Sequence, residues 1–390
     1  MRSGFRIGRV FGINIYIDWS WLFIFLLVTW NLAAGVFPSL HPDWSVPLYW
    51  GMGVAASVLF FASVLAHELA HAVVAQARGL SVRSITLFIF GGVANIEREP
   101  TSPGTEFLVA VVGPVTSIVL GVLATLAGIL LSRGGVTGSA SVEQALANLS
   151  PLTTLLLWLG PINIVLGLFN LVPGFPLDGG RVLRSLLWAA SGNLRQATRW
   201  ATWVGQAVAW LFIIAGIAMI FGVRIPFFGT GVISGLWLAF IGWFLNSAAV
   251  QSYRQVVVDD MLEGVPVARL MRRDAPTVAP NTSVSQLVDD FVMKTDERAF
   301  PVVDGDRLEG LVCLEDVRQV PRAAWDTTPV SQIMTPASQL TVVAPRDDAS
   351  QALQKLGQRD VRQIPVVQDG HVVGMLRRRD VLRWLQLQSA

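Results

Sequence analysis

Long apolar stretches separated by short polar segments dominate the first 250 residues of the chain. A helix that crosses the hydrocarbon core of a bilayer needs about 20 mostly apolar residues. The pattern predicts six such helices, at Asp18–Phe37, Leu48–Ala75, Glu106–Leu131, Leu152–Leu171, Trp200–Phe221 and Gly229–Ala249. Beyond about residue 250, Asp, Glu, Arg and Gln become frequent. The chain is therefore predicted to be a polytopic α-helical membrane domain, residues 1–250, followed by a soluble domain.

Composition supports a membrane protein. Of the 390 residues, 53% are hydrophobic and 14% are charged, whereas a soluble domain usually carries about 25% charged residues. The 14 tryptophans fit this class, because indole rings are enriched where a bilayer meets water. The net charge of +2 comes without a run of basic residues, so no nucleic-acid partner is predicted. Cys313 is the only cysteine, which excludes an intrachain disulfide framework.

The placement of arginines predicts the orientation of the spans, because positive charge accumulates on the cytosolic side. Arginines precede the first span and follow the second, fourth and sixth; they are Arg2, Arg6, Arg9, Arg78, Arg83, Arg98, Arg181, Arg184, Arg195, Arg199 and Arg254. The opposite loops hold only Arg133 and Arg224. We therefore expect a multi-pass protein of the cell membrane with its N- and C-termini in the cytosol.

Three ionisable residues interrupt the second apolar stretch, in the sequence HELAH. His67 and His71 are four positions apart, so on a helix they share one face, where two imidazoles can hold one divalent metal. Glu68 is rotated by about 100° from His67 and can accept a proton from an attacking water. Each such group costs about 2.5–3.5 kcal/mol on membrane-insertion scales, which disfavours a purely structural cluster. The spacing is that of zinc hydrolases, with two histidine ligands and a glutamate base.

A catalytic zinc site needs a third protein ligand, and the sequence offers one at the end of the fourth span. Residues 170–181 read NLVPGFPLDGGR, in which Pro173 and Pro176 break the helix. Non-helical backbone at membrane depth is tolerated only where protein buries it or where it lines a wet cavity. Asp178 lies in this segment and is the only acidic residue within residues 144–258. It is the candidate third ligand; the alternative is an ordinary turn at the membrane surface.

Residues 82–97 predict a β-hairpin, because β-branched and aromatic residues lie on both sides of Gly91 and Gly92. Since this segment directly follows the HELAH helix, we expect the hairpin to be associated with the membrane. It could offer an edge strand to an extended substrate, or it could simply cover the metal site.

Together these motifs resemble the site-2 protease family of intramembrane zinc metalloproteases, over most of residues 1–190. HELAH matches the HExxH motif of that family, and NLVPGFPLDGG matches its longer NxxPxxPxDGG signature. The segments FGGVA, Phe90–Ala94, and EFLVAVVGPVTS, Glu106–Ser117, are similar to family segments as well. The resemblance implies cleavage of a transmembrane segment of a substrate protein, in regulated intramembrane proteolysis.

The resemblance also implies one zinc ion per chain and a set of site residues, with His67, His71 and Asp178 as ligands and Glu68 as the catalytic base. Asn170 would lie near the substrate or its oxyanion. Asn163, seven residues earlier, could share a face with Asn170 and bind the freed substrate backbone, or it could form a hydrogen bond between helices instead.

After a predicted linker, residues 251–264, the chain contains two copies of one sequence unit, residues 265–322 and 323–390. Both copies have a methionine near the start, an amphipathic helix, the letters PVV and DG, and a final Asp-Val. Each copy is predicted to form strand, helix, strand, strand, helix, so the tail is an α/β domain. The tail resembles a tandem pair of cystathionine-β-synthase (CBS) domains, which we expect in the cytosol.

CBS pairs often bind adenine nucleotides, and their sequence pattern ends in Ser/Thr-x-x-Asp. Asp316 and Asp380 match the aspartate, a candidate ribose ligand. Cys313 and Arg377 stand at the hydroxyl position, a departure that weighs against nucleotide binding. The tail is thus either a nucleotide sensor or a structural module that forms a homodimer.

The sequence therefore predicts an intramembrane zinc metalloprotease that acts within the lipid bilayer on a membrane-protein substrate and is modulated by its CBS pair. The main alternative is a divalent-ion transporter or channel gated by the CBS pair, with His67, His71 and Asp178 as a transit site. Ion transit needs no general base beside the ligands, and magnesium favours oxygen ligands, so HELAH argues against this alternative. A third alternative is an inactive scaffold that binds membrane helices. The motifs lack no residue, so nothing in the sequence favours it.

Overall fold

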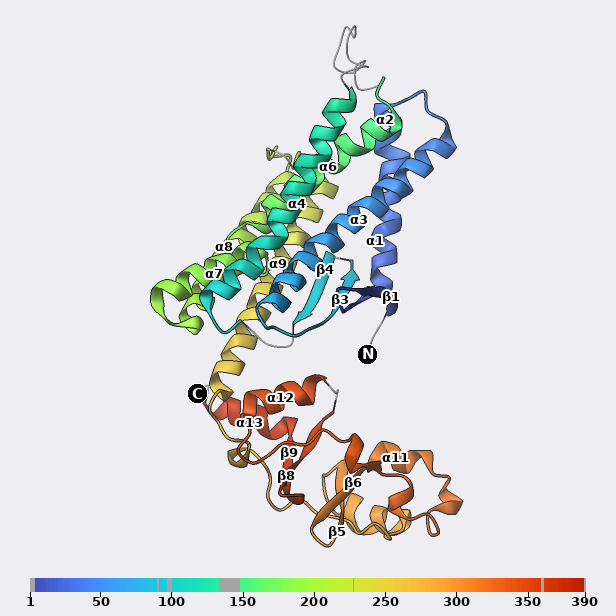
Figure 1. Cartoon of the computed structure of the whole chain (residues 1–390), viewed down its shortest axis with the longest axis vertical. Coiled ribbons are helices and arrows are strands. Elements are labelled where there is room, and N and C mark those ends of the chain that lie inside the picture. Colours follow the sequence, from blue (N-terminus) through green and yellow to red (C-terminus); the bar gives the residue numbers. More distant parts are fainter. Residues whose placement is uncertain are drawn as a thin grey trace. The chain divides into compact units, whose positions relative to one another are not determined.

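The computed structural model describes residues 4–89, 91–96, 100–132, 148–226, 228–358 and 361–388. The chain divides into two compact units, residues 1–253 and 254–390. Within the described residues, six helices are long and apolar enough to cross a membrane; they are Trp19–Leu40, α3 (Val46–Ala77), α4 (Pro103–Ser132), α6 (Pro151–Asn170), α8 (Leu194–Ile220) and α9 (Val232–Leu262). The first of them consists of α1 (Trp19–Asn31), a π-helical turn η1 (Leu32–Val36) and α2 (Phe37–Leu40). The six predicted spans are thus confirmed, and Figure 1 shows them as a bundle.

The predicted hairpin forms, but it is one half of a larger sheet. Two N-terminal strands that the sequence analysis did not predict complete a four-stranded sheet, whose strands in spatial order are β1 (Gly4–Val10), β2 (Ile13–Asp18), β3 (Val82–Phe88) and β4 (Gly91–Ile96). β2 and β3 are parallel, and the other pairs are antiparallel. Phe90 and Glu97, which the sequence assigns to the hairpin, lie outside the described residues. The sheet is therefore mixed, and β4 is one of its edge strands.

The sheet packs on the helix that carries HELAH. Ile13, Val82 and Ile85 of the sheet share a buried apolar core with Ala72 of α3 and Val109 of α4. Residues in a strand alternate between two faces, and β2 follows this rule, with every second residue buried. β3 and β4 accordingly lie beside the end of α3 that contains the two histidines (Figure 1).

Small residues let α4 and α6 approach each other closely. A β-carbon built on Gly121 of α4 would lie 2.6 Å from the carbonyl oxygen of Gly160 in α6, and one built on Gly167 would lie 2.8 Å from that of Pro114. Close packing of small residues is a common way of holding membrane helices together. Because α4 also packs on α3, this contact fixes α4 between the other two helices.

The segment between α6 and the next helix, α7 (Asp178–Ser191), is a tight non-helical turn, as its two prolines predict. A β-carbon on Gly174 of this turn would lie 2.4 Å from the Cα atom of Gly205 in α8, so the two backbones touch. α7 begins at Asp178, and a carboxylate at a helix N-terminus is favoured by the helix dipole. α8 thus supports the turn that positions Asp178.

The tail unit contains two β-hairpins that meet edge to edge. Its sheet has the order β5-β6-β9-β8, with β7 beside β6; the strands are β5 (Ala299–Asp304), β6 (Arg307–Cys313), β7 (Thr335–Pro336), β8 (Gln363–Gln368) and β9 (His371–Arg377). Its helices are α10 (Val284–Gln286) with a π-helical turn η3 (Leu287–Val292), α11 (Leu314–Gln319), α12 (Ala349–Gln358) and α13 (Arg378–Gln388). The tail is therefore an α/β domain, as predicted.

The strand expected at the start of each repeat is reduced to one parallel bridge, from Val278 to Val302 in the first repeat and from Val343 to Val366 in the second. Prolines explain the difference. Pro276, Pro280 and Pro345 lie within two residues of the bridging valines Val278 and Val343, and proline has no N–H to donate to a strand ladder.

The two repeats are interlocked. Val267, at the start of the first repeat, is buried in the core of the second repeat around Ile364. Val330, at the start of the second repeat, is buried in the core of the first around Phe300. The segment 251–264, expected as a linker, is helical as far as Leu262, where it ends α9. Each repeat completes the core of the other, and together they form one compact unit.

Candidate functional site

The two histidines of HELAH lie side by side on α3, as their spacing of four residues predicts. Their Nε2 atoms are 3.1 Å apart. Both side chains are buried, with 4% of His67 and 5% of His71 exposed. Two imidazole nitrogens therefore face the same point in the interior of the helix bundle.

Asp178 completes a cluster of three residues. Its Oδ2 atom lies 3.1 Å from the Nε2 atom of His67 and 3.1 Å from that of His71. The structure thus brings together the three residues that the sequence analysis predicts as ligands. Among the His, Cys, Asp and Glu residues described, these three form a group that could hold a metal ion.

Hydrogen bonds with α4 orient both imidazole rings. The carbonyl oxygen of Val109 lies 2.5 Å from Nδ1 of His71 and can only accept, so Nδ1 carries the hydrogen and Nε2 keeps its lone pair. The hydroxyl of Ser117 lies 2.9 Å from Nδ1 of His67 and can accept a hydrogen bond in the same way. Partners of this kind fix the tautomer and the orientation of metal-binding histidines.

The cluster fits a tetrahedral zinc ion. Its three ligand atoms are 3.1 Å from one another, close to the separation of about 3.3 Å that follows from tetrahedral angles and bonds of about 2.0–2.1 Å. Two histidines and one carboxylate are also a known ligand set of catalytic zinc. Gly113 of α4 faces the cluster: a β-carbon there would lie 2.2 Å from Nε2 of His71 and 2.8 Å from Nε2 of His67. A glycine at this position leaves the space in front of the ligand atoms open.

Glu68 lies against the edge strand β4. A β-carbon built on Gly92 would lie 2.4 Å from Cγ of Glu68, and Glu68 directly follows His67 of the cluster on α3. The neighbouring Gly91 has a φ of 127°, a conformation that L side chains rarely adopt. The predicted base is therefore next to both the cluster and the strand that is predicted to receive a substrate.

The two predicted asparagines make local hydrogen bonds in α6. The Nδ2 atoms of Asn163 and Asn170 each donate to the carbonyl oxygen four residues earlier, at 2.9 and 3.0 Å. Asn163 is 1% exposed and lies four positions before Gly167, which touches α4. This placement favours a role for Asn163 in helix packing, whereas Asn170 ends α6 at the turn that leads to Asp178.

Three residues of α4 surround the cluster, and the sequence motifs did not predict a function for any of them. Val109, Gly113 and Ser117 are spaced by four residues, so they lie on one face of α4. They belong to the segment Glu106–Ser117. Its similarity to segments of the site-2 protease family is the one feature of the sequence that could have pointed to them. A backbone carbonyl, a glycine and a serine are ordinary in an apolar helix, so residue type alone does not indicate their function.

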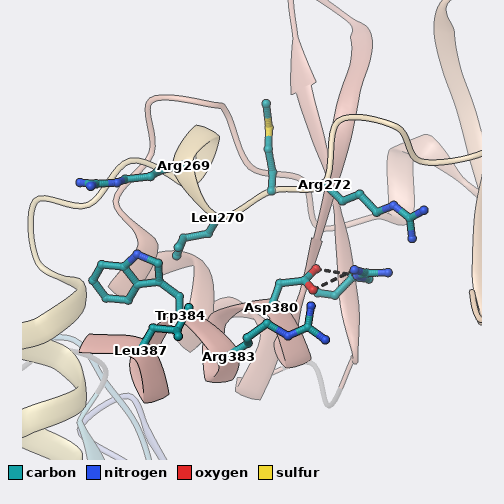
Figure 2. A pocket seen from close by; sticks show the side chains of 9 residues that line it. Arg269, Leu270, Arg272, Asp380, Arg383, Trp384 and Leu387 are labelled. Carbon is teal, nitrogen blue, oxygen red and sulfur yellow. Dashed lines mark hydrogen bonds and ion pairs between the residues drawn. The ribbon is translucent and has the colours of Figure 1, made fainter. Parts of the chain in front are cut away.

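The tail unit contains a pocket of about 280 Å³ beside Asp380 (Figure 2). Four arginines, one aspartate, one tryptophan and three apolar residues line it; they are Arg269, Leu270, Met271, Arg272, Arg377, Asp380, Arg383, Trp384 and Leu387. Arg377 holds Asp380 by donating from Nε and Nη2 to its two carboxylate oxygens, at 2.5 and 2.8 Å. Asp316, the other candidate ribose ligand, accepts the N–H of Cys313 at 2.8 Å and caps α11.

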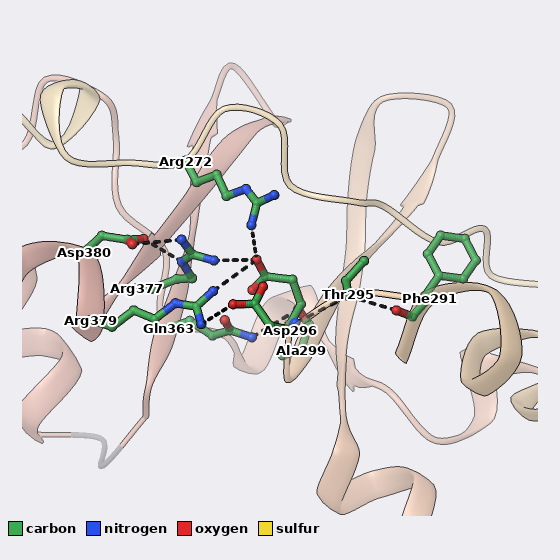
Figure 3. A network of polar contacts seen from close by, with 10 residues as sticks. Arg272, Phe291, Thr295, Asp296, Ala299, Gln363, Arg377, Arg379 and Asp380 are labelled. Carbon is green, nitrogen blue, oxygen red and sulfur yellow. Dashed lines mark hydrogen bonds and ion pairs between the residues drawn. The ribbon is translucent and has the colours of Figure 1, made fainter. Parts of the chain in front are cut away.

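Glu297 joins the two repeats through the side chains of Arg272 and Arg377, two arginines labelled in Figure 3. Its Oε1 atom accepts hydrogen bonds from Nη1 of Arg272 at 2.6 Å and from Nη1 of Arg377 at 2.5 Å. Arg377 therefore bonds both to Glu297 of the first repeat and to Asp380 of the second. The arginine that stands where the CBS pattern has a hydroxyl is engaged within the chain.

Six long apolar helices, together with a buried His, His, Asp cluster that has a glutamate beside it, are typical of a membrane-embedded zinc metalloprotease. Comparisons with known proteins agree with this class. Residues 55–214 match Peptidase family M50, and residues 267–322 and 330–387 match the CBS domain. The Synechocystis sp. protein sll0528, named as a zinc metalloprotease, is 35% identical over 100% of this chain and 97% of its own length.

Rip3 of Mycobacterium tuberculosis, also named as a zinc metalloprotease, is 34% identical over 99% of this chain and 94% of its own length. Among solved structures, the site-2 protease from Methanocaldococcus jannaschii matches 64% of this chain and 94% of its own length, with 24% identity and a TM-score of 0.42. The identity to sll0528 and Rip3 over nearly their full lengths settles the family. This chain belongs to the site-2 protease family of zinc metalloproteases, and it is a multi-pass membrane protein with two CBS domains.

Proposed function

We propose that this chain is an intramembrane zinc protease that cuts a transmembrane segment of a membrane-protein substrate, as in regulated intramembrane proteolysis. One observation carries the proposal: the Nε2 atoms of His67 and His71 and the Oδ2 atom of Asp178 are mutually 3.1 Å apart within an apolar helix bundle. Ionisable groups at membrane depth are costly, so three of them converging on one point without a task are hard to explain.

His67, His71 and Asp178 would hold one zinc ion. When bound, zinc supplies a Lewis acid that activates water and polarises the scissile carbonyl. Glu68 is the general base: it accepts a proton as water attacks the carbonyl carbon and passes that proton to the leaving amine nitrogen. The peptide bond breaks as the acyl carbon gains the hydroxyl and the amine gains the hydrogen, so the reaction consumes one water and no other reactant.

The edge strand β4 is the proposed contact for an unwound substrate. A helical peptide bond is shielded by its neighbours, so the substrate must become extended before Glu68 can act on it. An extended peptide can add to the edge of a sheet through backbone hydrogen bonds, and β4 is the outer strand next to Glu68. In this proposal Gly91 and Gly92 keep β4 free of side chains that would obstruct the peptide.

Gly91→Val tests this contact, and Gly79→Val is its matched control. Both glycines have a positive φ and an open space where a β-carbon would stand, so both substitutions strain the backbone without a clash. Only Gly91 belongs to β4. We expect Gly91→Val to slow cleavage of a reconstituted substrate while zinc content stays at the wild-type level, and Gly79→Val to slow it much less. Equal cleavage by both variants would count against the pairing.

The proposal places the N- and C-termini in the cytosol, on the basis of the arginine-rich loops. The HELAH sequence then lies towards the cytosolic end of α3, where water can reach it from the cytosol. Asn170, at the end of α6, is proposed to lie close to the substrate. Accessibility labelling of cysteines introduced at Asp43 and at Ser252 in intact cells tests the orientation, because these positions should be on opposite sides of the membrane.

Glu68→Gln separates proteolysis from ion transport. The wild-type chain and the variant are reconstituted in liposomes with a candidate single-span substrate and an enclosed ion indicator. Proteolysis predicts substrate fragments with the wild type, no fragments with Glu68→Gln, and equal zinc content in both. A transporter would keep its divalent-ion flux in the variant and would release no fragments from either. Co-expression with single-span proteins, with Glu68-dependent fragments as the readout, identifies the substrate.

We also propose that the CBS pair modulates proteolysis by binding an anionic ligand in the pocket beside Asp380. Four arginines and Trp384 line this pocket, which suits a ligand with phosphate groups and an aromatic ring, such as an adenine nucleotide. A ribose hydroxyl would compete with Arg377 for the carboxylate of Asp380, since Arg377 bonds to both of its oxygens. Ligand binding would therefore loosen the link between Arg377 and its partners.

Calorimetric titration of the intact protein with ATP and with AMP tests the sensor proposal. Binding that is lost in Asp380→Ala and kept in Asp316→Ala would assign the nucleotide to this pocket. The absence of a response to either nucleotide would leave the pair as a structural module, for which the test is the oligomeric state of the purified chain.

A further inference from the structure

A buried ion pair links α4 to α7 close to the metal centre. Glu106, in the first turn of α4, is 0% exposed, and Arg184, in α7, is 4% exposed. Nε of Arg184 donates to Oε1 of Glu106 at 2.6 Å, and Nη2 of Arg184 contacts the same oxygen. The guanidinium of Arg184 also lies 5.3 Å from the ring centroid of Phe175, which belongs to the turn before Asp178.

This pair extends a pattern along α4. Glu106, Val109, Gly113 and Ser117 are separated by three or four residues, so they lie on one face of the helix. Ser117 contacts His67 and Val109 contacts His71. Glu106 contacts the helix that begins at Asp178. Each of the three proposed ligands is therefore tied to the same face of α4, the first two directly and the third through Arg184.

We propose that Glu106 is a positioning residue for the third ligand, Asp178, and that it acts through Arg184. The inference rests on the metal centre proposed above. Asp178 stands at the first position of α7, directly after an irregular turn, so its location depends on what holds α7. A slide of α7 by one residue would move Asp178 by about 1.5 Å, which is enough to separate its Oδ2 atom from the two imidazoles.

The chemistry of the pair favours positioning over simple packing. Replacing a buried ion pair by apolar residues of similar size is often neutral or stabilising, so packing alone does not require one. An arginine with two donors on one carboxylate oxygen instead fixes direction as well as distance. The best-attested use of a buried ion pair is to specify one register between elements, and the register of α7 on α4 decides where Asp178 lies.

The test measures zinc retention by purified full-length chains under challenge with a chelator. Partners that orient metal ligands typically change metal affinity by about 10–100-fold when they are mutated, so we expect a loss of that size in Glu106→Gln and in Arg184→Gln. Arg181→Gln is the matched control. Arg181 lies on the same helix with its Nε atom 4.0 Å from the same oxygen of Glu106, and it is 25% exposed. Its substitution should change zinc affinity by less than about threefold.

A second readout separates positioning from stability. The double variant Glu106→Gln with Arg184→Gln leaves no buried charge without its partner, and its zinc-free melting temperature should stay near that of the zinc-free wild type. Positioning predicts that zinc raises this melting temperature much less in the double variant than in the wild type, because stabilisation by a ligand follows its affinity. The absorption spectrum of the cobalt-substituted variant should also change, because it reports ligand geometry.

Wild-type zinc affinity and an unchanged cobalt spectrum in Glu106→Gln, in Arg184→Gln and in the double variant would overturn the inference. The proposed protease would remain intact. A wild-type chain that retains no zinc would overturn both. Arg184→Lys keeps the positive charge but loses the paired N–H donors of the guanidinium. Partial recovery of zinc affinity in this variant, relative to Arg184→Gln, would support positioning.

Discussion

Gly113 of α4 faces the Nε2 atom of His71 so closely that a β-carbon at Gly113 would lie 2.2 Å from it. The same β-carbon would lie 2.8 Å from Nε2 of His67. Real β-carbons do not approach other atoms this closely, so a side chain there would displace both rings. The lack of a side chain at Gly113 is therefore a requirement of the proposed metal centre, although α4 contributes none of the proposed ligands.

Gly113→Ala is expected to abolish zinc binding with little loss of fold. Alanine favours a helix over glycine by about 1 kcal/mol, so α4 itself should not suffer. The displaced imidazoles, however, can no longer converge on Asp178, and zinc affinity should fall by more than about 100-fold. Metal analysis after dialysis against a chelator measures the effect.

Gly104→Ala, in the first turn of the same helix, is the matched control for Gly113→Ala. A β-carbon at Gly104 has no neighbour within 4 Å, so its zinc content should equal that of the wild type. Full zinc occupancy in Gly113→Ala would show that the rings do not hold the metal in the arrangement described here.

The apolar pattern and two motifs predict much of the membrane unit. The six spans follow from the length of apolar stretches, and the partnership of HELAH with Asp178 follows because Asp178 is an isolated acid in a broken segment. β1 and β2 are not predicted, because each is short and becomes a strand only by pairing with its neighbours in the sheet. The roles of Gly113 and Ser117 depend on how closely α4 approaches α3, which is a property of the packed bundle and not of either residue type.

The tail is a similar case. Its two repeats and their hairpins are readable from the sequence because PVV and DG recur at equivalent positions. The sequence also shows that Arg377 stands where the CBS pattern has a hydroxyl residue, but it does not show what Arg377 binds. Only the structure brings Glu297, 80 positions earlier in the chain, against the guanidinium of Arg377.

Glu297→Gln is expected to destabilise the tail unit. Glu297 is 7% exposed and accepts charged hydrogen bonds from Arg272 and Arg377. Each such bond contributes about 1.5–3 kcal/mol, so loss of the carboxylate charge should lower the free energy of unfolding by about 2–3 kcal/mol. Native-state hydrogen exchange of amides in β5 and β9 of the full-length chain measures this change.

The control for Glu297→Gln is Asp290→Asn, which breaks an ion pair with Lys294 in the same unit. Both side chains of that pair are more than half exposed, and such pairs contribute less than about 1 kcal/mol. If the two substitutions change exchange equally, Glu297 is not a link between the repeats.

Cys313 is expected to react slowly with alkylating reagents at neutral pH. Burial raises the pKa of the Cys313 thiol to about 12, and the charges of Asp316 and Glu315 act in the same direction. The thiolate is the reactive form, so at pH 8 iodoacetamide should label Cys313 at least about 100-fold more slowly than it labels a free thiol. The rate should rise nearly tenfold per pH unit up to about pH 11, because the thiolate fraction rises in that proportion.

Mass spectrometry of the intact chain measures the labelling of Cys313 without ambiguity, because the sequence has no other cysteine. Labelling in denaturant provides the control and should proceed at the rate of a free thiol. Rapid labelling of the folded chain at pH 7.5 would contradict the raised pKa of this partly buried thiol.

The central claim is that His67, His71 and Asp178 hold one zinc ion, and its most direct test is the zinc content and zinc X-ray absorption of the purified wild type and of Asp178→Ala. Asp43→Ala, in the loop before α3, serves as the control. The account predicts one zinc per chain, with two imidazole nitrogens and a carboxylate oxygen among its ligands, in the wild type and in the control. It predicts that Asp178→Ala loses the zinc or binds it without that oxygen. Full zinc content with an unchanged absorption spectrum in Asp178→Ala would contradict the metal centre on which the proposed protease depends.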